Sequence, residues 1–99
     1  MAIVQFTRYK SDNSEELVKT AKIAKKIFEK HGAEFFRLSR FHTGAFAGQW
    51  LVATRYPSWE VYGKVQDALT KDADFARLLS HVSTFAELTG RNTAVSIDL

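Results

Sequence analysis

Histidine is the residue type in this chain best suited to proton transfer, because only imidazole has an ordinary pKa near neutrality. The chain contains three. His42 is the strongest candidate for a catalytic role, since it lies on a predicted strand, opposite or near Trp50. The alternative is that His42 is a hydrogen-bonded structural residue. His31 and His81 fall on predicted helices at spacings that match no metal site, so we expect no metal.

Other kinds of reactive site are excluded or unsupported. The chain has no cysteine, which rules out disulfides, thiolate metal sites and cysteine nucleophiles. It also has no glycine-rich phosphate loop, no serine elbow and no closely spaced pair of carboxylates. We therefore expect no cofactor.

A larger group of polar and aromatic residues falls on one face of the predicted sheet, because successive strand residues alternate between faces. The group is Gln5, Thr7, Tyr9, Arg40, His42, Trp50, Thr54 and Tyr56. Aromatic walls with a few polar groups are typical of a pocket for a small, flat, partly apolar ligand. They are equally typical of a dimer interface whose polar groups satisfy one another. The candidate ligand contacts are Thr7, Tyr9, Arg40, Trp50, Thr54 and Tyr56.

Three arginines offer a possible anion site. Arg8, Arg37 and Arg55 lie on predicted strands, and in one register of the hairpin Arg37 faces Arg55 directly. Such a pair would need a carboxylate or an anionic ligand, whereas a shift of two residues removes the conflict. Arg40 with His42 is an alternative place for an anion.

Two kinds of periodicity define the elements that must hold these residues. Period-2 alternation predicts strands over 3–9, 34–43, 49–56 and 93–99, with GAFAG as the hairpin loop and TGRN as a turn before the last strand. Period-3.6 patterning predicts a helix over 14–31, a second after Ser58 and a further helical piece that buries Phe75, Leu78, Leu79 and Val82.

Local signals mark the helix ends. Asn13 is a predicted N-cap with Glu16 closing a capping box, and Gly32 is placed to end the first helix. Pro57 ends a strand because it lacks an amide donor, and Ser58 directly after it is a good N-cap. The last helical piece starts with a cap at Asp72 or Asp74.

The order strand, helix, strand, strand, helix, strand is that of a ferredoxin-like βαββαβ fold, of class α+β. We expect residues 1–99 to form a single domain with an antiparallel four-stranded sheet and helices on one face. Right-handed crossovers place the first and third strands in the centre.

The two faces of the sheet are harder to assign. We expect Val4 and Phe6 to face the helices with Leu51 and Ala53. The other face would then expose Phe36, Leu38, Trp50, Val52 and Tyr56. So much apolar surface predicts a second copy of the chain as cover, and hence a homodimer that packs sheet against sheet.

The net charge of +3 does not by itself indicate nucleic acid binding. The lysines concentrate in one predicted helix, at Lys19, Lys22, Lys25, Lys26 and Lys30. A run of this kind is typical of a solvated helix face, with an anion or nucleic-acid patch as the alternative. The N-terminal residues lack a signal-peptide pattern and no apolar run is long enough to span a membrane, so we expect a cytoplasmic protein without nucleic acid or membrane partners.

The run YPSWEVYGKV (56–65), followed by DADF (72–75), resembles the dimeric α+β barrel superfamily in element order and lengths. That superfamily includes antibiotic-biosynthesis-type monooxygenases, muconolactone isomerases and stress-responsive barrel proteins. The resemblance implies a dimeric α+β barrel built from two chains. Its cofactor-free monooxygenases use an asparagine, a tryptophan and a histidine, but the spacing of Asn13, Trp50 or Trp59, and His42 or His81 does not map onto that pattern.

Two functions follow from these observations. The first is a homodimeric small-molecule-binding or accessory protein. The alternative is a cofactor-independent monooxygenase or isomerase acting on a small aromatic or quinone-like compound, with His42 as proton-transfer group and with Trp50 and Tyr56 as walls.

Overall fold

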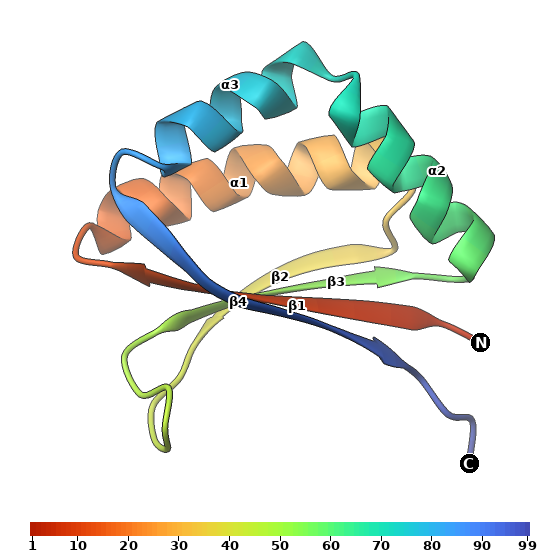
Figure 1. Ribbon diagram of the computed structural model, residues 1–99, viewed down its shortest axis with the longest axis horizontal. Coiled ribbons are helices and arrows are strands. Elements are labelled where there is room, and N and C mark those ends of the chain that lie inside the picture. Colours follow the sequence, from red (N-terminus) through yellow and green to blue (C-terminus); the bar gives the residue numbers. More distant parts are fainter.

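Three helices pack on one face of a four-stranded antiparallel sheet, and the opposite face carries no helix (Figure 1). The computed structural model describes residues 1–99. The elements are β1 (Ile3–Ser11), α1 (Ser14–His31), β2 (Phe35–Arg40), β3 (Trp50–Tyr56), α2 (Trp59–Thr70), α3 (Ala73–Val82) and β4 (Ala86–Val95). The predicted α+β class and βαββαβ order are confirmed, with the second helical region divided into α2 and α3.

The strand order β2-β3-β1-β4 places β1 and β3 in the centre, as predicted. In the hairpin, Arg37 pairs with Ala53 and Phe35 pairs with Arg55. The direct pairing of Arg37 with Arg55 therefore does not occur. Arg55 lies 3.5 Å from the carboxylate of Glu34 instead.

Side chains cap each helix where the sequence predicted. The Asn13 side chain accepts a hydrogen bond from the Glu16 amide at 3.1 Å, and Ser58 accepts one from Val61 at 3.2 Å. The capping box is not closed, because the Glu16 carboxylate contacts His81. Gly32, at a φ of 121°, ends α1 with a backbone conformation that favours glycine.

The last strand begins earlier than predicted. β4 starts at Ala86, so TGRN is part of the strand and not a turn, and residues 96–99 lie beyond it. Gly90 lies within the strand, and the Arg8 guanidinium lies against the place where a Cβ would stand. The register with β1 also shifts between Arg8 and Tyr9, which marks a bulge in β4.

The prediction of which residues share a face is correct for those that lie on strands, which excludes His42, but the predicted orientation of that face is wrong. Gln5 pairs with Thr54 and Thr7 with Val52, so these residues do lie on one side of the sheet. They are buried beneath the helices, at 9% exposure for Gln5 and 7% for Thr7. Val4 and Phe6 consequently lie on the uncovered face.

The main apolar cluster occupies one end of the space between the sheet and the helices. Its buried members are Ile3, Ile27, Ala33, Tyr56, Val65 and Leu69. Tyr56 is fully buried and meets the Tyr62 ring edge-on, with centroids 5.1 Å apart. Tyr62 in turn meets Trp59, whose side chain is 57% exposed. The aromatic residues after Pro57 therefore anchor the start of α2 to the end of β3.

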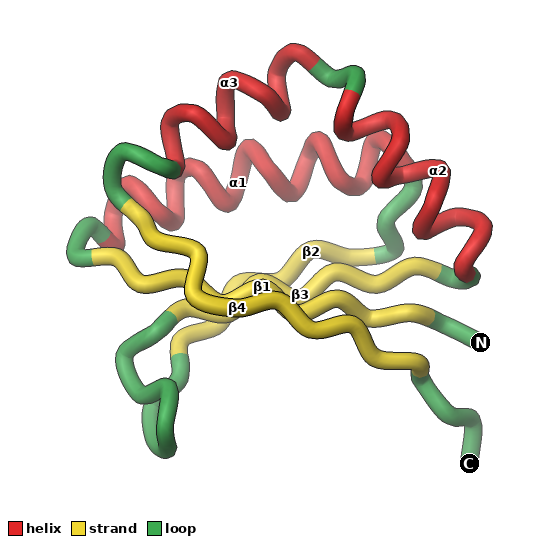
Figure 2. The backbone as a smooth tube through the Cα atoms, in the orientation of Figure 1, coloured by secondary structure: helices red, strands yellow, loops and turns green.

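The uncovered face of the sheet is concave. The 41–49 hairpin loop and the C-terminal residues both extend away from the helices, on either side of this face (Figure 2). None of the three helices combines the length and apolar content that a bilayer crossing requires.

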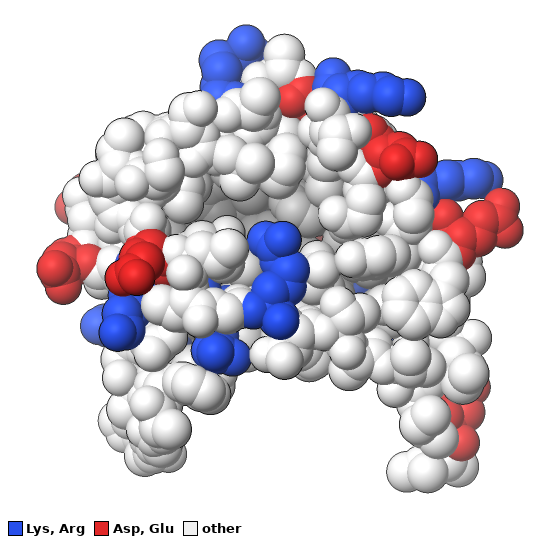
Figure 3. All heavy atoms as spheres, viewed as in Figure 1, with Lys and Arg blue, Asp and Glu red and all other residues white.

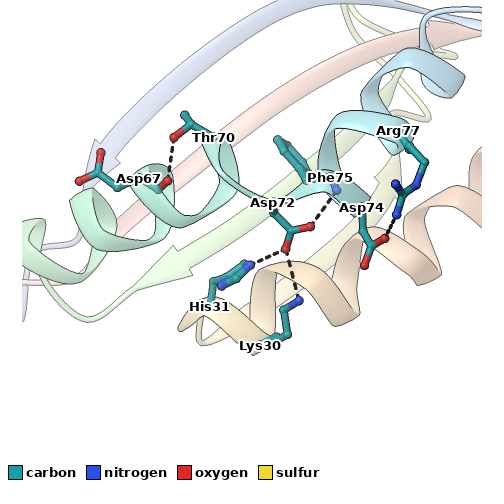
Figure 4. Close-up of polar contacts among 8 residues, drawn as sticks. All are labelled: Lys30, His31, Asp67, Thr70, Asp72, Asp74, Phe75 and Arg77. Carbon is teal, nitrogen blue, oxygen red and sulfur yellow. Dashed lines mark hydrogen bonds and ion pairs between the residues drawn. The ribbon is translucent and has the colours of Figure 1, made fainter.

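One carboxylate joins the C-terminal end of α1 to the start of α3. Asp72 caps α3 through the Phe75 amide at 3.1 Å and contacts His31 at 2.6 Å and Lys30 at 3.3 Å (Figure 4). The hydrogen bond from His31, followed by that from the Phe75 amide, holds the pKa of Asp72 well below its usual range. Asp72 is the residue of the predicted pair that forms the cap.

We predict that Asp72→Asn lowers the melting temperature near neutral pH. A depressed carboxyl pKa stabilises the fold above the unfolded-state value of about 3.9, and that contribution is lost as the pH falls further. The difference from wild type should therefore be largest between about pH 5 and 7 and should shrink below about pH 4. Thermal unfolding followed by circular dichroism measures it.

The matched control is Asp74→Asn, because Asp74 lies in the first turn of the same helix and pairs only with the exposed Arg77. This variant should show a smaller loss. Equal losses for the two variants at every pH would contradict the role assigned to Asp72.

Candidate functional site

A cavity of about 190 Å³ lies between the sheet and the helices. Its floor consists of residues from all four strands and its roof of residues from all three helices. Figure 3 shows a hollow on this side of the molecule, between the helical layer and the strands, with a basic side chain at its rim. The cavity is therefore open to solvent at one side.

Small residues on α1 create this space. Thr20, Ala21 and Ala24 face the cavity, and Phe28 stands at the same surface closer to the apolar cluster. The short side chains of Thr20, Ala21 and Ala24 leave space above the floor of the cavity. The Thr20 hydroxyl also donates to the Glu16 carbonyl at 2.9 Å, which satisfies it within the helix.

The roof is completed by α3, which has an apolar inner side but no fully buried residue. Phe75, Leu78 and Val82 line the cavity from this helix. Two histidine–carboxylate contacts fasten α3 to α1: Asp72 with His31 at one end, and His81 with Glu16 at 2.7 Å at the other. The two helices therefore run antiparallel and are joined at both ends.

The floor of the cavity is polar along the middle of the sheet. Gln5, Thr7 and Thr54 lie there, and all three are buried. The Gln5 amide donates to the Tyr62 hydroxyl at 3.1 Å, and the Tyr56 hydroxyl donates to Thr54 at 3.2 Å. Burial raises the pKa of Tyr56, an effect that the hydrogen bond with Thr54 opposes.

Tyr9 and Arg91 form the most polar part of the lining. Arg91 pairs with Thr7 in the sheet register, so its side chain lies on the cavity face, and it is exposed on the edge strand β4. Burial raises the pKa of Tyr9, and the nearby Arg91 guanidinium opposes that shift. Because its pKa is raised above 10, the Tyr9 hydroxyl stays protonated at neutral pH and can donate a hydrogen bond.

One donor in this region lacks a well-formed hydrogen bond. The side-chain Nε2 of Gln66, a residue of α2 that lines the cavity, is buried and makes no hydrogen bond of good geometry, although Gln66 lies close enough to the Tyr56 hydroxyl to oppose the rise that burial causes in the pKa of that group. Buried polar atoms without a partner are uncommon in folded proteins. An acceptor on a bound molecule would satisfy this atom.

The structure brings together only part of the predicted site. Thr7, Tyr9 and Thr54 line the cavity, and Tyr56 is buried directly beside Thr54. His42 is exposed on the hairpin loop and does not line the cavity.

Arg40 and Trp50 form a pair at the hairpin end of the strands, also outside the cavity lining. The Arg40 guanidinium lies 4.9 Å from the centroid of the Trp50 ring. Arg40 also donates to the Gly48 carbonyl at 3.2 Å. The proposed pairing of Arg40 with His42 around a ligand therefore has no counterpart in this cavity.

The three arginines of the other predicted anion site, Arg8, Arg37 and Arg55, lie on the uncovered face. The Arg8 guanidinium stacks 3.9 Å from the centroid of Phe46 and donates to Asn92 at 3.3 Å. The Arg37 guanidinium lies 4.0 Å from the ring centroid of Phe35. These cations contact aromatic rings and strand side chains.

Sequence reasoning missed Arg91 and Gln66. Interpreting TGRN as a turn removed Arg91 from the sheet, although the alternation through Thr93 and Val95 extends back to it with the same parity. Gln66 lies next to the predicted core residue Val65 on α2, and the helical pattern alone gives no reason to single it out.

No group of three or more histidine, aspartate and glutamate side chains is arranged to hold a metal ion. The cavity lining itself contains no carboxylate and no histidine. Its polar groups are hydroxyls, amides and the guanidinium of Arg91.

Comparison with solved structures identifies proteins of the same architecture. A mutant of SnoaB, a cofactor-independent oxygenase from Streptomyces nogalater, matches with a TM-score of 0.75 at 7% identity, covering 99% of this chain and 95% of that one. The chain has the ferredoxin-like α+β fold of this protein. At such identity the likeness establishes the fold alone.

Two further structures agree. A NIPSNAP family protein from Agrobacterium tumefaciens matches with a TM-score of 0.73 at 16% identity, covering 99% of this chain and 95% of that one. Rv0793 from Mycobacterium tuberculosis matches with a TM-score of 0.70 at 13% identity, covering 100% and 98%. At the level of sequence, no protein-family model and no curated protein matches the chain.

The raised pKa values of Tyr9 and Tyr56 predict that these two tyrosines ionise at a higher pH than an ordinary tyrosine. In an alkaline titration followed by absorbance, the folded protein should contain tyrosines that ionise above the usual value of about 10. Tyr9→Phe and Tyr56→Phe should each remove one of the groups that ionise above this value. Circular dichroism over the same range confirms that the fold persists, and a single transition near pH 10 in the folded wild type would contradict the assignment.

Proposed function

We propose that this protein binds a small, flat, mainly apolar molecule in the cavity between the sheet and the helices. The observation that carries the proposal is the combination of apolar walls from the helices with hydrogen-bonding groups from the middle of the sheet. Ligand pockets typically have this composition, in which apolar walls supply affinity and a few polar groups fix orientation.

The size of the cavity limits the ligand. An engineered apolar cavity of about 150 Å³ holds benzene. A cavity of about 190 Å³ therefore suits one substituted ring or a compact bicyclic compound.

The alternative is a cofactor-independent oxygenase or isomerase acting on an aromatic or quinone-like compound. Its support is the fold shared with SnoaB, which is described as a cofactor-independent oxygenase. His42 was the expected proton-transfer group, and it lies outside the cavity. Because no residue of the lining has an ordinary pKa near neutrality, ligand binding is the better-supported function.

A substitution that fills the cavity should weaken ligand binding without lowering the stability of the fold. Ala24 is buried on α1 and lines the cavity, so Ala24→Leu places three additional carbons in the ligand space. We predict that this variant binds 2-naphthol, a flat neutral probe, at least tenfold more weakly than wild type. Because the new side chain enters an existing void, the free energy of unfolding should stay within about 1 kcal/mol of wild type. Isothermal titration calorimetry and chemical denaturation give the two quantities.

The matched control is Ala76→Leu, which makes the same change at an exposed position of α3 and should leave 2-naphthol binding unchanged. If Ala24→Leu proves unstable, Ala21→Leu fills the same cavity from a partly exposed position. Undiminished binding by a folded cavity-filling variant would place the bound probe elsewhere and overturn the proposal.

We further propose that two copies associate through the uncovered face of the sheet. Apolar side chains from three strands lie on this face, at Val4, Phe6, Phe35, Leu51 and Ala53. The Nε atom of Arg8, which lies near them, is buried and lacks an acceptor. Both features favour a partner surface over bulk water.

We predict that the wild type sediments at about twice the chain mass of 11.2 kDa at micromolar concentration. Ala53→Lys should sediment as a monomer, because it places an ammonium group from each copy in the centre of the shared apolar face. Ala53 is only half-buried in the single chain, so the monomer tolerates the change. Ala76→Lys on α3 is the control and should remain dimeric. A wild type that is monomeric at this concentration would contradict the proposal.

A further inference from the structure

The cavity has a single charge, and nothing in the protein neutralises it. Arg91 is the only charged residue in the lining. It forms no salt bridge, whereas Arg55 and Arg77 each lie close to a carboxylate. A guanidinium beside an apolar space therefore has its bidentate hydrogen-bonding face available to a molecule in that space.

Two further polar side chains of the cavity lining can act as hydrogen-bond donors. The Tyr9 hydroxyl is protonated at neutral pH, and the buried Nε2 of Gln66 makes no hydrogen bond of good geometry. A ligand with a negative charge and acceptor oxygens would complement all of these groups. A ligand with donors alone would complement none of them.

The geometry of the opening fits the same chemistry. Arg91 is exposed on the edge strand, while the apolar residues of the helices line the interior. A molecule with its ring inside can therefore keep a charged end at the rim, where part of its hydration is retained. This arrangement avoids burying a charge completely, which is costly.

We propose that the ligand is a flat apolar carboxylate, such as a one-ring or two-ring aromatic acid, with its carboxylate on Arg91 and Tyr9 and its ring between the sheet and the helices. The proposal rests on the cavity being the binding site, as inferred above. A carboxylate matches the planar fork of a guanidinium with two parallel hydrogen bonds.

The test compares 2-naphthoate with 2-naphthamide, which have the same rings and nearly the same shape but differ in charge. In isothermal titration calorimetry at low salt, wild type should bind 2-naphthoate about tenfold more tightly than 2-naphthamide. This ratio reflects a charge-assisted hydrogen bond reduced by the exposure of Arg91. The ratio should fall as salt is added, because the charge is at the rim.

Substitution of the arginine identifies the source of the preference. Arg91→Gln should remove the preference for 2-naphthoate and leave the affinity for 2-naphthamide unchanged. Arg91→Lys should give an intermediate ratio, since it keeps the charge but loses the fork. Arg77→Gln, an exposed arginine of α3 outside the lining, is the matched control and should behave as wild type. Circular dichroism of each variant confirms folding.

The outcomes separate this proposal from the proposed function. Equal binding of the two probes by wild type, or a preference that survives in Arg91→Gln, would overturn the carboxylate proposal and leave small-molecule binding intact. Absence of binding for both probes and for 2-naphthol would overturn the proposed function itself.

Discussion

The pairing register of β1 is the constraint on which the candidate site depends. This strand is hydrogen-bonded on both sides, to β3 and to β4, so its orientation is fixed along its whole length. Gln5, Thr7 and Tyr9 consequently face the helices, and a slip of one residue would replace them with Val4, Phe6 and Arg8. That exchange would close the cavity with apolar side chains and place a second arginine beneath the roof.

Buried polar side chains, such as those on the floor of this cavity, are unusual in the centre of a small protein. Burying amides and hydroxyls costs free energy unless they are hydrogen-bonded, and here Gln5 and Thr54 find partners in Tyr62 and Tyr56. The apolar cluster at the other end of the layer, around Ile3 and Val65, supplies the close packing that the cavity lacks. The close-packed region that stabilises the fold and the cavity that can hold a ligand thus lie at different places along the sheet.

Much of the fold follows from local signals in the sequence. The caps at Asn13 and Ser58 and the break at Pro57 are decided by neighbouring backbone groups, so they can be predicted without knowledge of the tertiary structure. Alternation likewise predicts that Thr7 and Thr54 share a face. It cannot tell which side of the sheet the helices cover, because that depends on the crossovers, and here the buried side is the more polar one on β1.

The site was less predictable than the fold for related reasons. Arg91 was missed because Gly90 and Asn92 favour turns by composition, whereas in the structure both residues continue β4, and the Arg8 guanidinium of the neighbouring strand lies against Gly90. His42 was chosen because imidazole has an ordinary pKa near neutrality and because the predicted strand placed it near Trp50, yet β2 ends at Arg40 and His42 lies in the exposed loop. The cavity itself depends on the distance between layers, which side-chain patterns along one element do not encode.

The attachment of α3 also determines how the molecule fluctuates. This helix is held by a half-buried apolar side and by one histidine–carboxylate contact at each end, so its release from α1 exposes far less surface than unfolding of the sheet. Regions of this kind open below the free energy of global unfolding, as cooperative local units. Because α3 roofs the cavity, its backbone amides exchange with solvent through the same opening that uncovers the space beneath it, and a molecule held in that space slows their exchange.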